Sequence, residues 1–134
     1  MPPRYTKSAL IAFSLFLAGL VVLADSGHGG WLFALAGRIP AGDKLGHFLL
    51  FGTLSCLLNG HWRGKTLRLF GRTALWGSTL IMAVVTLEEC SQVFFRSRTF
   101  DLLDLTADAV GIWFGGRLVR ACLRRPPARP PATV

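Results

Sequence analysis

Five of the seven acidic residues of this chain lie in one short segment, EECSQVFFRSRTFDLLDLTAD, which covers residues 88–108 and also holds two arginines. Carboxylates beside a histidine or an arginine can transfer protons, or can bind the hydroxyl, amine and anionic groups of a ligand. The chain as a whole is 51% hydrophobic. In such a chain, charge away from water is costly unless it finds partners. The segment is therefore the first candidate for a functional site.

The spacing of the acids places several of them on one face of a predicted helix. Asp101, Asp104, Asp108, Gly111 and Gly115 follow one another at alternating intervals of three and four residues. The two glycines form a GxxxG pattern that lets another helix approach closely, within the chain or between two chains. We therefore expect this face to look into a bundle. Asp101 is explained as a helix N-cap, whereas Asp108 lies about two turns further on, where backbone amides are already satisfied.

Two other segments carry residues of the same kinds. Asp43 and His47 are four residues apart and share a helix face with Lys44 beside them, while Glu89 and Gln92 are three apart near the end of another predicted helix. Simpler roles stay open for them. Asp43 can be an N-cap, His47 can bond a neighbour, and the glutamate can be a solvated interfacial charge.

Four apolar stretches have about the length, roughly 17 to 25 residues, that a helix needs to cross a hydrocarbon core. They cover residues 8–24, 45–60, 73–87 and about 102–122. The second and third are short unless each gains a turn from its flanks, so we place the spans at about 8–24, 43–60, 73–92 and 101–122. The sequence thus predicts an all-α membrane protein. We expect one four-transmembrane-helix bundle over residues 1–124 and a Pro-rich disordered tail over 125–134.

The basic residues are distributed by loop, which predicts the topology. The N-terminal tail, the loop after the second span and the C-terminal end carry eleven basic residues and no acid: Arg4, Lys7, Arg63, Lys65, Arg68, Arg72, Arg117, Arg120, Arg124, Arg125 and Arg129. Basic flanks stay in the cytoplasm, so both termini are predicted inside and the acidic loops outside. This accounts for the net charge of +8 without nucleic acid. Membrane lipids are the expected partners.

Three smaller features complete the prediction. The cysteines Cys56, Cys90 and Cys122 are odd in number and lack CxxC spacing, so we expect no structural disulfide and no Cys-rich zinc site. The apolar island at 31–36 is too short to span and is expected at the outer interface. We interpret residues 1–24 as a retained anchor, and cleavage as a signal peptide stays the alternative.

The acidic segment and the segment DKLGHFLLF at 43–51 together resemble the VanZ-like family of small integral membrane proteins. The family pattern runs D-K-x-x-H-F, then E-x-x-Q, R, D, D, N, G and G. The matching positions are Asp43, Lys44, His47, Phe48, Glu89, Gln92, Arg98, Asp101, Asp104, Asp108, Gly111 and Gly115. The chain departs from the pattern at Asp108, where the family has Asn.

This resemblance covers residues 43–116 and implies a role in the bacterial cell envelope, in the cytoplasmic (inner) membrane. The family takes its name from a protein associated with resistance to the glycopeptide teicoplanin. The resemblance therefore implies an effect on glycopeptide sensitivity, and it implies no reaction.

Three functions stay open at this point. The first is an outward-facing pocket that binds or processes a cell-envelope lipid or glycolipid, with ligand contacts from Asp43, Lys44, Gln92, Arg98, Asp101 and Asp108. The second is an enzyme in which Glu89 or Asp104 is the general base and His47 is the acid or an orienting group. The third is a structural or partner-binding protein in which the polar cluster is an ion-pair network that holds the bundle together. We expect neither a cofactor nor a metal, since the acids and the histidine lack HExxH-like spacing.

Overall fold

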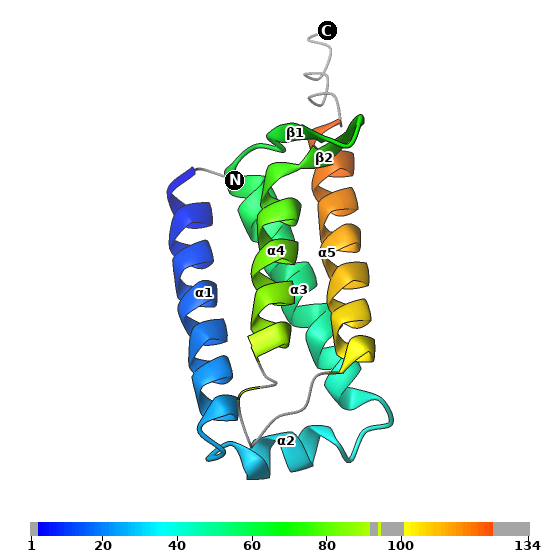
Figure 1. Ribbon diagram of the computed structural model, residues 1–134. Coiled ribbons are helices and arrows are strands. Elements are labelled where there is room, and N and C mark those ends of the chain that lie inside the picture. The colour runs from blue at the N-terminus through cyan, green and yellow to red at the C-terminus, as the bar shows by residue number, and fades with distance from the viewer. Residues whose placement is uncertain (1–2, 92–93, 95–100, 125–134) are drawn as a thin grey trace, which may run out of the picture.

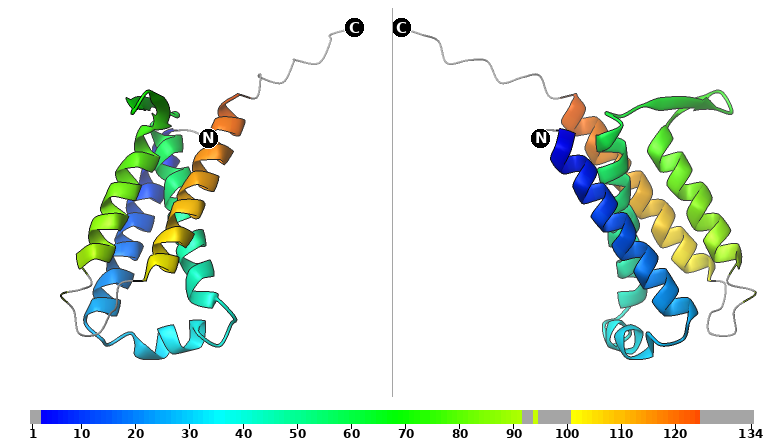
Figure 2. Two further views of the ribbon diagram at one scale, coloured as in Figure 1. Left: turned by 45° about the vertical axis from the view of Figure 1, so that its right-hand side comes forward. Right: turned by 90° about the vertical axis from the view of Figure 1, so that its left-hand side faces the viewer.

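A computed structural model describes residues 3–91, 94 and 101–124, and this part of the chain is mostly helical. The elements are α1 (Pro3–Asp25), α2 (Gly30–Ala36), α3 (Gly42–His61), β1 (Thr66–Leu69), β2 (Arg72–Leu75), α4 (Trp76–Ser91) and α5 (Leu102–Leu123). The four long helices run side by side (Figure 1). Short α2 lies across one end of the bundle, and the β1–β2 hairpin lies across the other (Figures 1 and 2).

One helix in the described part of the chain is long and apolar enough to cross a membrane by itself. This is α1, whose segment Thr6–Ala24 is almost wholly exposed on the bundle. The other long helices fail that test: α4 has only 16 residues, and α3 and α5 contain too many polar and charged residues among their apolar ones. A single such helix is weak evidence for a membrane protein, so the expectation of four spans needs further support.

The closest helix contact in the bundle is between α3 and α5, and glycines make it. A Cβ added at Gly111 would collide with the backbone carbonyl of Phe48, and one added at Gly115 would collide with that of Gly52. Gly52 itself lies so close that its Cβ would be 3.1 Å from the Gly111 carbonyl oxygen. The GxxxG pattern of α5 is thus used inside the chain, where it brings two backbones together.

Polar side chains occupy the most buried positions of the bundle. The largest side chains that are fully buried are Glu89, Asn59, Asp108 and Ser55. The buried apolar cluster is small and consists of Ile81, Val85 and Ile112, with partly buried neighbours around it. Many large apolar side chains instead lie on the outside, among them Leu80, Val84, Leu87, Val110, Trp113, Phe114 and Leu118.

The β1–β2 hairpin is absent from the sequence-based prediction, which places a basic loop at this position. Thr66 to Leu69 pair with Arg72 to Leu75 in antiparallel register, and Phe70 and Gly71 form the turn. Both turn residues have positive φ, 47° and 75°, as in the two-residue turns that match the twist of a hairpin. The all-α expectation therefore holds for the helices and misses this element. It also places the start of α4 too early, because residues 73–75 are paired in β2.

We predict that Gly115→Ala destabilises the bundle, whereas Gly46→Ala does not. A methyl group at position 115 meets backbone and Ser55 atoms on α3, which cannot move aside as a flexible side chain would. The expected loss is about 1 to 3 kcal/mol in the free energy of unfolding, measured by circular dichroism of the purified protein in detergent.

Gly46 on α3 is the matched control, since nothing lies within 4 Å of a Cβ built there. Its substitution is expected to be neutral or stabilising by about 1 kcal/mol, because alanine is the better helix former. Equal losses for both variants would contradict the close α3–α5 contact.

Candidate functional site

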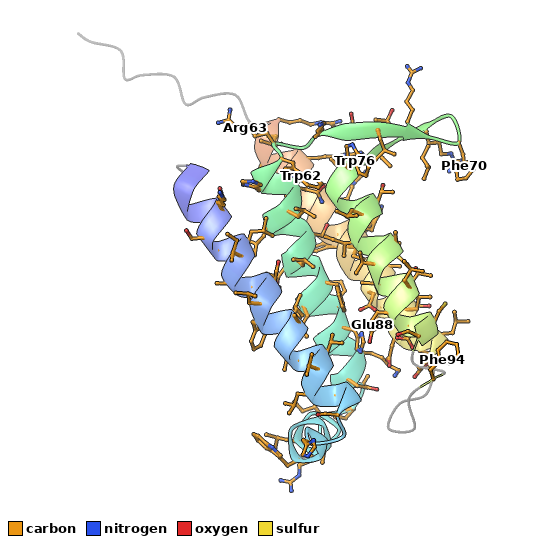
Figure 3. The ribbon with its side chains drawn as sticks, turned by 60° about the vertical axis from the view of Figure 1, so that its left-hand side comes forward. Trp62, Arg63, Phe70, Trp76, Glu88 and Phe94 are labelled. Carbon is orange, nitrogen blue, oxygen red and sulfur yellow. The ribbon has the colours of Figure 1, made fainter. Side chains whose placement is uncertain are left out.

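The sequence-predicted site residues that the structure describes meet at the end of the bundle opposite the hairpin. α3 and α5 begin at this end and α4 finishes there, so Asp43 and His47, Glu89, and Asp101 come together from three helices. Figure 3 shows the neighbouring Glu88 at this end of α4, far from the hairpin. Two predicted members, Gln92 and Arg98, lie outside the described residues. We call the described group the polar site: Asp43, Lys44, His47, Glu89, Asp101, Asp104 and Asp108.

Lys44 joins three carboxylates of the polar site. Its Nζ lies 2.7 Å from Asp43 Oδ2, 2.8 Å from Asp104 Oδ1 and 3.1 Å from Asp101 Oδ2. An ammonium group has three hydrogen-bond donors, and these contacts use all of them. The side chain of Lys44 therefore connects the start of α3 to the start of α5.

His47 pairs with the most deeply buried acid of α5. His47 Nδ1 lies 2.9 Å from Asp108 Oδ1, and His47 Nε2 lies 3.9 Å from Asp104 Oδ2, which is beyond hydrogen-bond distance. Asp108 is 1% exposed. Its second oxygen, Oδ2, is buried and has no hydrogen-bond partner among the residues that the structure describes.

Glu89, near the end of α4, holds the start of α5 in place. It is 1% exposed, and its Oε1 accepts the backbone N–H of Asp101 at 2.7 Å. Asp101 in turn caps α5, since its Oδ1 accepts the N–H of Leu103 at 2.8 Å. This N–H and the ammonium of Lys44 both bind the carboxylate of Asp101.

The His47–Asp108 pair can perform proton transfer. When Asp108 is ionised, its carboxylate only accepts hydrogen bonds, and Nδ1 of His47 then carries the proton in this contact. The lone pair of a neutral imidazole then lies on Nε2. A histidine oriented in this way by a buried aspartate can take a proton from a hydroxyl, an amine or a water and later return it.

A second polar cluster lies in the half of the bundle nearer the hairpin, and the sequence prediction did not single it out. Ser55 Oγ donates to the Ile112 carbonyl at 2.8 Å, and Asn59 Nδ2 donates to the Ser55 carbonyl and to Ser78 Oγ, each at 2.9 Å. The Ser78 N–H reaches Asn59 Oδ1 at 3.3 Å. Ser55 and Asn59 are four residues apart inside an apolar stretch, a signal that was available. Because its members bond one another, this cluster is a structural link between α3, α4 and α5.

No group of three or more His, Cys, Asp or Glu side chains that could hold a metal ion occurs within residues 3–91, 94 and 101–124. The three cysteines are free, and Cys56 Sγ contacts the Gly115 carbonyl at 3.4 Å. Trp31, in the predicted interfacial island, is exposed on α2.

No protein-family model matches this chain, and no curated protein sequence or solved structure shows significant similarity to it. The resemblance to the VanZ-like family therefore rests on the motif residues alone. Its functional implications stay predictions.

We predict opposite effects for two substitutions of Asp108. Asp108→Asn keeps an acceptor for His47 Nδ1 and removes a buried charge, so the protein should unfold at the same or a higher denaturant concentration than the wild type. Asp108→Ala leaves the histidine without its partner and should cost about 1 to 3 kcal/mol. Chemical unfolding in mild detergent, followed by circular dichroism, measures both. If Asp108→Asn is as destabilising as Asp108→Ala, the bundle depends on the charge of Asp108.

Proposed function

We propose that this chain is a membrane protein with four spanning helices and both termini in the cytoplasm. The distribution of side chains, with polar groups buried and large apolar groups exposed, supports four spans more strongly than helix length does. In the bundle the largest fully buried side chains are polar, while the outward surfaces of α4 and α5 carry leucine, valine, phenylalanine and tryptophan. Lipid accepts such a surface, and polar groups in a membrane bundle face its interior.

The charges of the two bundle ends support the orientation. The hairpin end carries Arg63, Lys65, Arg68 and Arg72, together with the basic residues near the end of α5. Every acid that the structure describes belongs to the last residues of α1 and α4 or the first turns of α3 and α5, at the other end. By the positive-inside rule, the polar site faces outward, away from the cytoplasm.

We further propose that the polar site binds the head group of a cell-envelope lipid or glycolipid. The observation that carries this proposal is the state of His47: Asp108 Oδ1 lies 2.9 Å from its Nδ1, its Nε2 lies beyond hydrogen-bond distance of Asp104 Oδ2, and its side chain is 23% exposed. A ligand hydroxyl or amine can donate to this imidazole nitrogen.

Lys44 contributes to this function indirectly. Its ammonium group is already shared by three carboxylates of the chain, so it holds the acids in place and is not free to bind an anionic ligand. Lys44 and Arg98 are the two cations among the expected ligand contacts, so Arg98 is left as the one expected to bind an anion. The geometry thus favours a ligand rich in hydroxyl or amine groups, as sugar and amino-sugar head groups are.

Catalysis is a second candidate function, and the His47–Asp108 contact is the observation that favours it. In that case His47 is the group that accepts a proton from a ligand hydroxyl or from water. Glu89 suits a base less well, because its Oε1 already accepts the Asp101 amide. Glu89 then acts as a positioning residue for the start of α5.

We predict that His47→Ala, Glu89→Gln and Arg98→Ala alter the sensitivity of cells to lipoglycopeptide antibiotics while the protein still accumulates folded in the membrane. Removing the imidazole removes the nitrogen proposed to bind the ligand, Glu89→Gln weakens the acceptor of the Asp101 amide, and Arg98→Ala removes the expected anion contact. The measurements are the folded amount in isolated membranes, expected to be unchanged, and the minimal inhibitory concentration, expected to change by more than the twofold step of a dilution series.

His28→Ala is the matched control, because His28 is exposed in the loop between α1 and α2 at the same end of the bundle. It should leave both readouts unchanged. If all three site variants fail to accumulate, the polar site holds the bundle together and its role is structural. If they accumulate normally and sensitivity is unchanged, the envelope-ligand proposal loses its support.

A further inference from the structure

The turn of the β1–β2 hairpin exposes an aromatic residue in an unfavourable backbone conformation. Phe70 is 96% exposed and has a φ of 47°. Two-residue hairpin turns of this kind favour asparagine, aspartate or glycine at the first position, because a side chain such as phenylalanine is strained there. Within the described chain Phe70 gains almost no burial in return. Strain of this type is commonly retained where a residue has a function outside its own fold.

The surroundings of Phe70 are basic and aromatic. Arg63, Lys65, Arg68 and Arg72 are exposed along the hairpin and its entry, and the described acids all lie at the far end of the bundle. Two tryptophans, Trp62 and Trp76, flank the base of the hairpin with ring centroids 6.5 Å apart, and both are partly exposed. Tryptophan at a helix end and basic residues beside it are typical of the level of lipid head groups.

The direction of the hairpin decides which partner it fits. It extends sideways across the ends of the helices, and its tip with Phe70 reaches past α4 (Figure 3). An arm that binds a membrane surface has to run along that surface, across the ends of the spanning helices. This one lies in the plane that a membrane surface would occupy, beyond the edge of the protein.

We infer that the β1–β2 hairpin is a lipid-binding arm that lies on the cytoplasmic leaflet, inserts Phe70 at the boundary between head groups and acyl chains, and binds anionic head groups through its basic residues. This inference rests on the proposed membrane insertion and adds a second lipid contact on the face opposite the polar site. Each basic residue at an anionic surface strengthens the association by roughly fivefold. Phe70 adds an apolar contact, as aromatic side chains do in interfacial segments.

The experiment places a nitroxide label at position 70 of the full chain. Phe70→Cys is made with Cys56, Cys90 and Cys122 replaced by alanine, and the labelled protein is reconstituted in nanodiscs of phosphatidylcholine with or without phosphatidylglycerol. Accessibility to oxygen, which concentrates in hydrocarbon, is compared with accessibility to an uncharged nickel complex that stays in water. We expect the oxygen-to-nickel ratio at position 70 to rise at least about fivefold when phosphatidylglycerol is present.

Labels at two further positions test the membrane proposal separately from the lipid-binding arm. Val110→Cys on the exposed face of α5 reports whether that helix lies in lipid, and Ser26→Cys in the loop after α1 is the aqueous reference. In the Arg68→Gln, Arg72→Gln variant, the lipid-dependent rise at position 70 should be lost while helical content is unchanged.

Three results would overturn the inference. A water-accessible label at 70 in both lipids, with position 110 in hydrocarbon, rejects the arm and leaves the membrane proposal standing; the hairpin would then be free for a soluble partner. A label at 70 that lies in lipid without phosphatidylglycerol rejects the recognition of anionic head groups. A water-accessible label at 110 rejects the four-span proposal and the arm with it.

Discussion

The approach of α3 to α5 is the constraint on which the rest of the structure depends. Three glycines, Gly52, Gly111 and Gly115, remove the side chains that would hold these helices apart, and the two backbones meet. Because the axes are so close, short side chains can reach across. Ser55 on α3 reaches the Ile112 carbonyl, and His47 reaches Asp108 at 2.9 Å. A wider spacing would remove both contacts, so the polar site is a consequence of the glycines as much as of the acids.

Burying acids inside an apolar bundle is costly, and the contacts of Lys44 and His47 offset this cost. Lys44 compensates the acids nearest the surface, where water also helps, and His47 compensates Asp108, where water does not reach. One carboxylate oxygen of Glu89 accepts the backbone N–H of Asp101, and this hydrogen bond connects the end of α4 to the start of α5. The contacts within the polar site therefore stabilise the bundle, whether or not the site also binds a ligand. The network is not complete, because the buried Oδ2 of Asp108 has no hydrogen-bond partner among the described residues, and this costs the bundle stability.

The sequence predicts the helical framework and the face of α5 well, since intervals of three and four residues determine which side chains share a helix face. The sequence does not show which side chains bind one another. Lys44 has several carboxylates within the same predicted region, and only the three-dimensional spacing shows that it binds three of them. The hairpin was missed because its turn is Phe-Gly, which lacks the Asn-Gly signal, and because each strand has only four residues. Ser55 and Asn59 were missed because two small polar residues do not disturb the apolar pattern of a span.

The residue at position 108 bears on whether the polar site only binds or also reacts. The resemblance to the VanZ-like family implies an asparagine here, and an asparagine would accept the same hydrogen bond from His47 Nδ1 without burying a carboxylate. For packing alone, the amide is therefore the better choice. An aspartate offers one thing that the amide does not, a negative charge 2.9 Å from the imidazole. That charge stabilises the imidazolium formed when His47 takes a proton from a ligand. An ionised Asp108 would therefore suit the proton transfer proposed for His47, whereas the amide would suit packing alone.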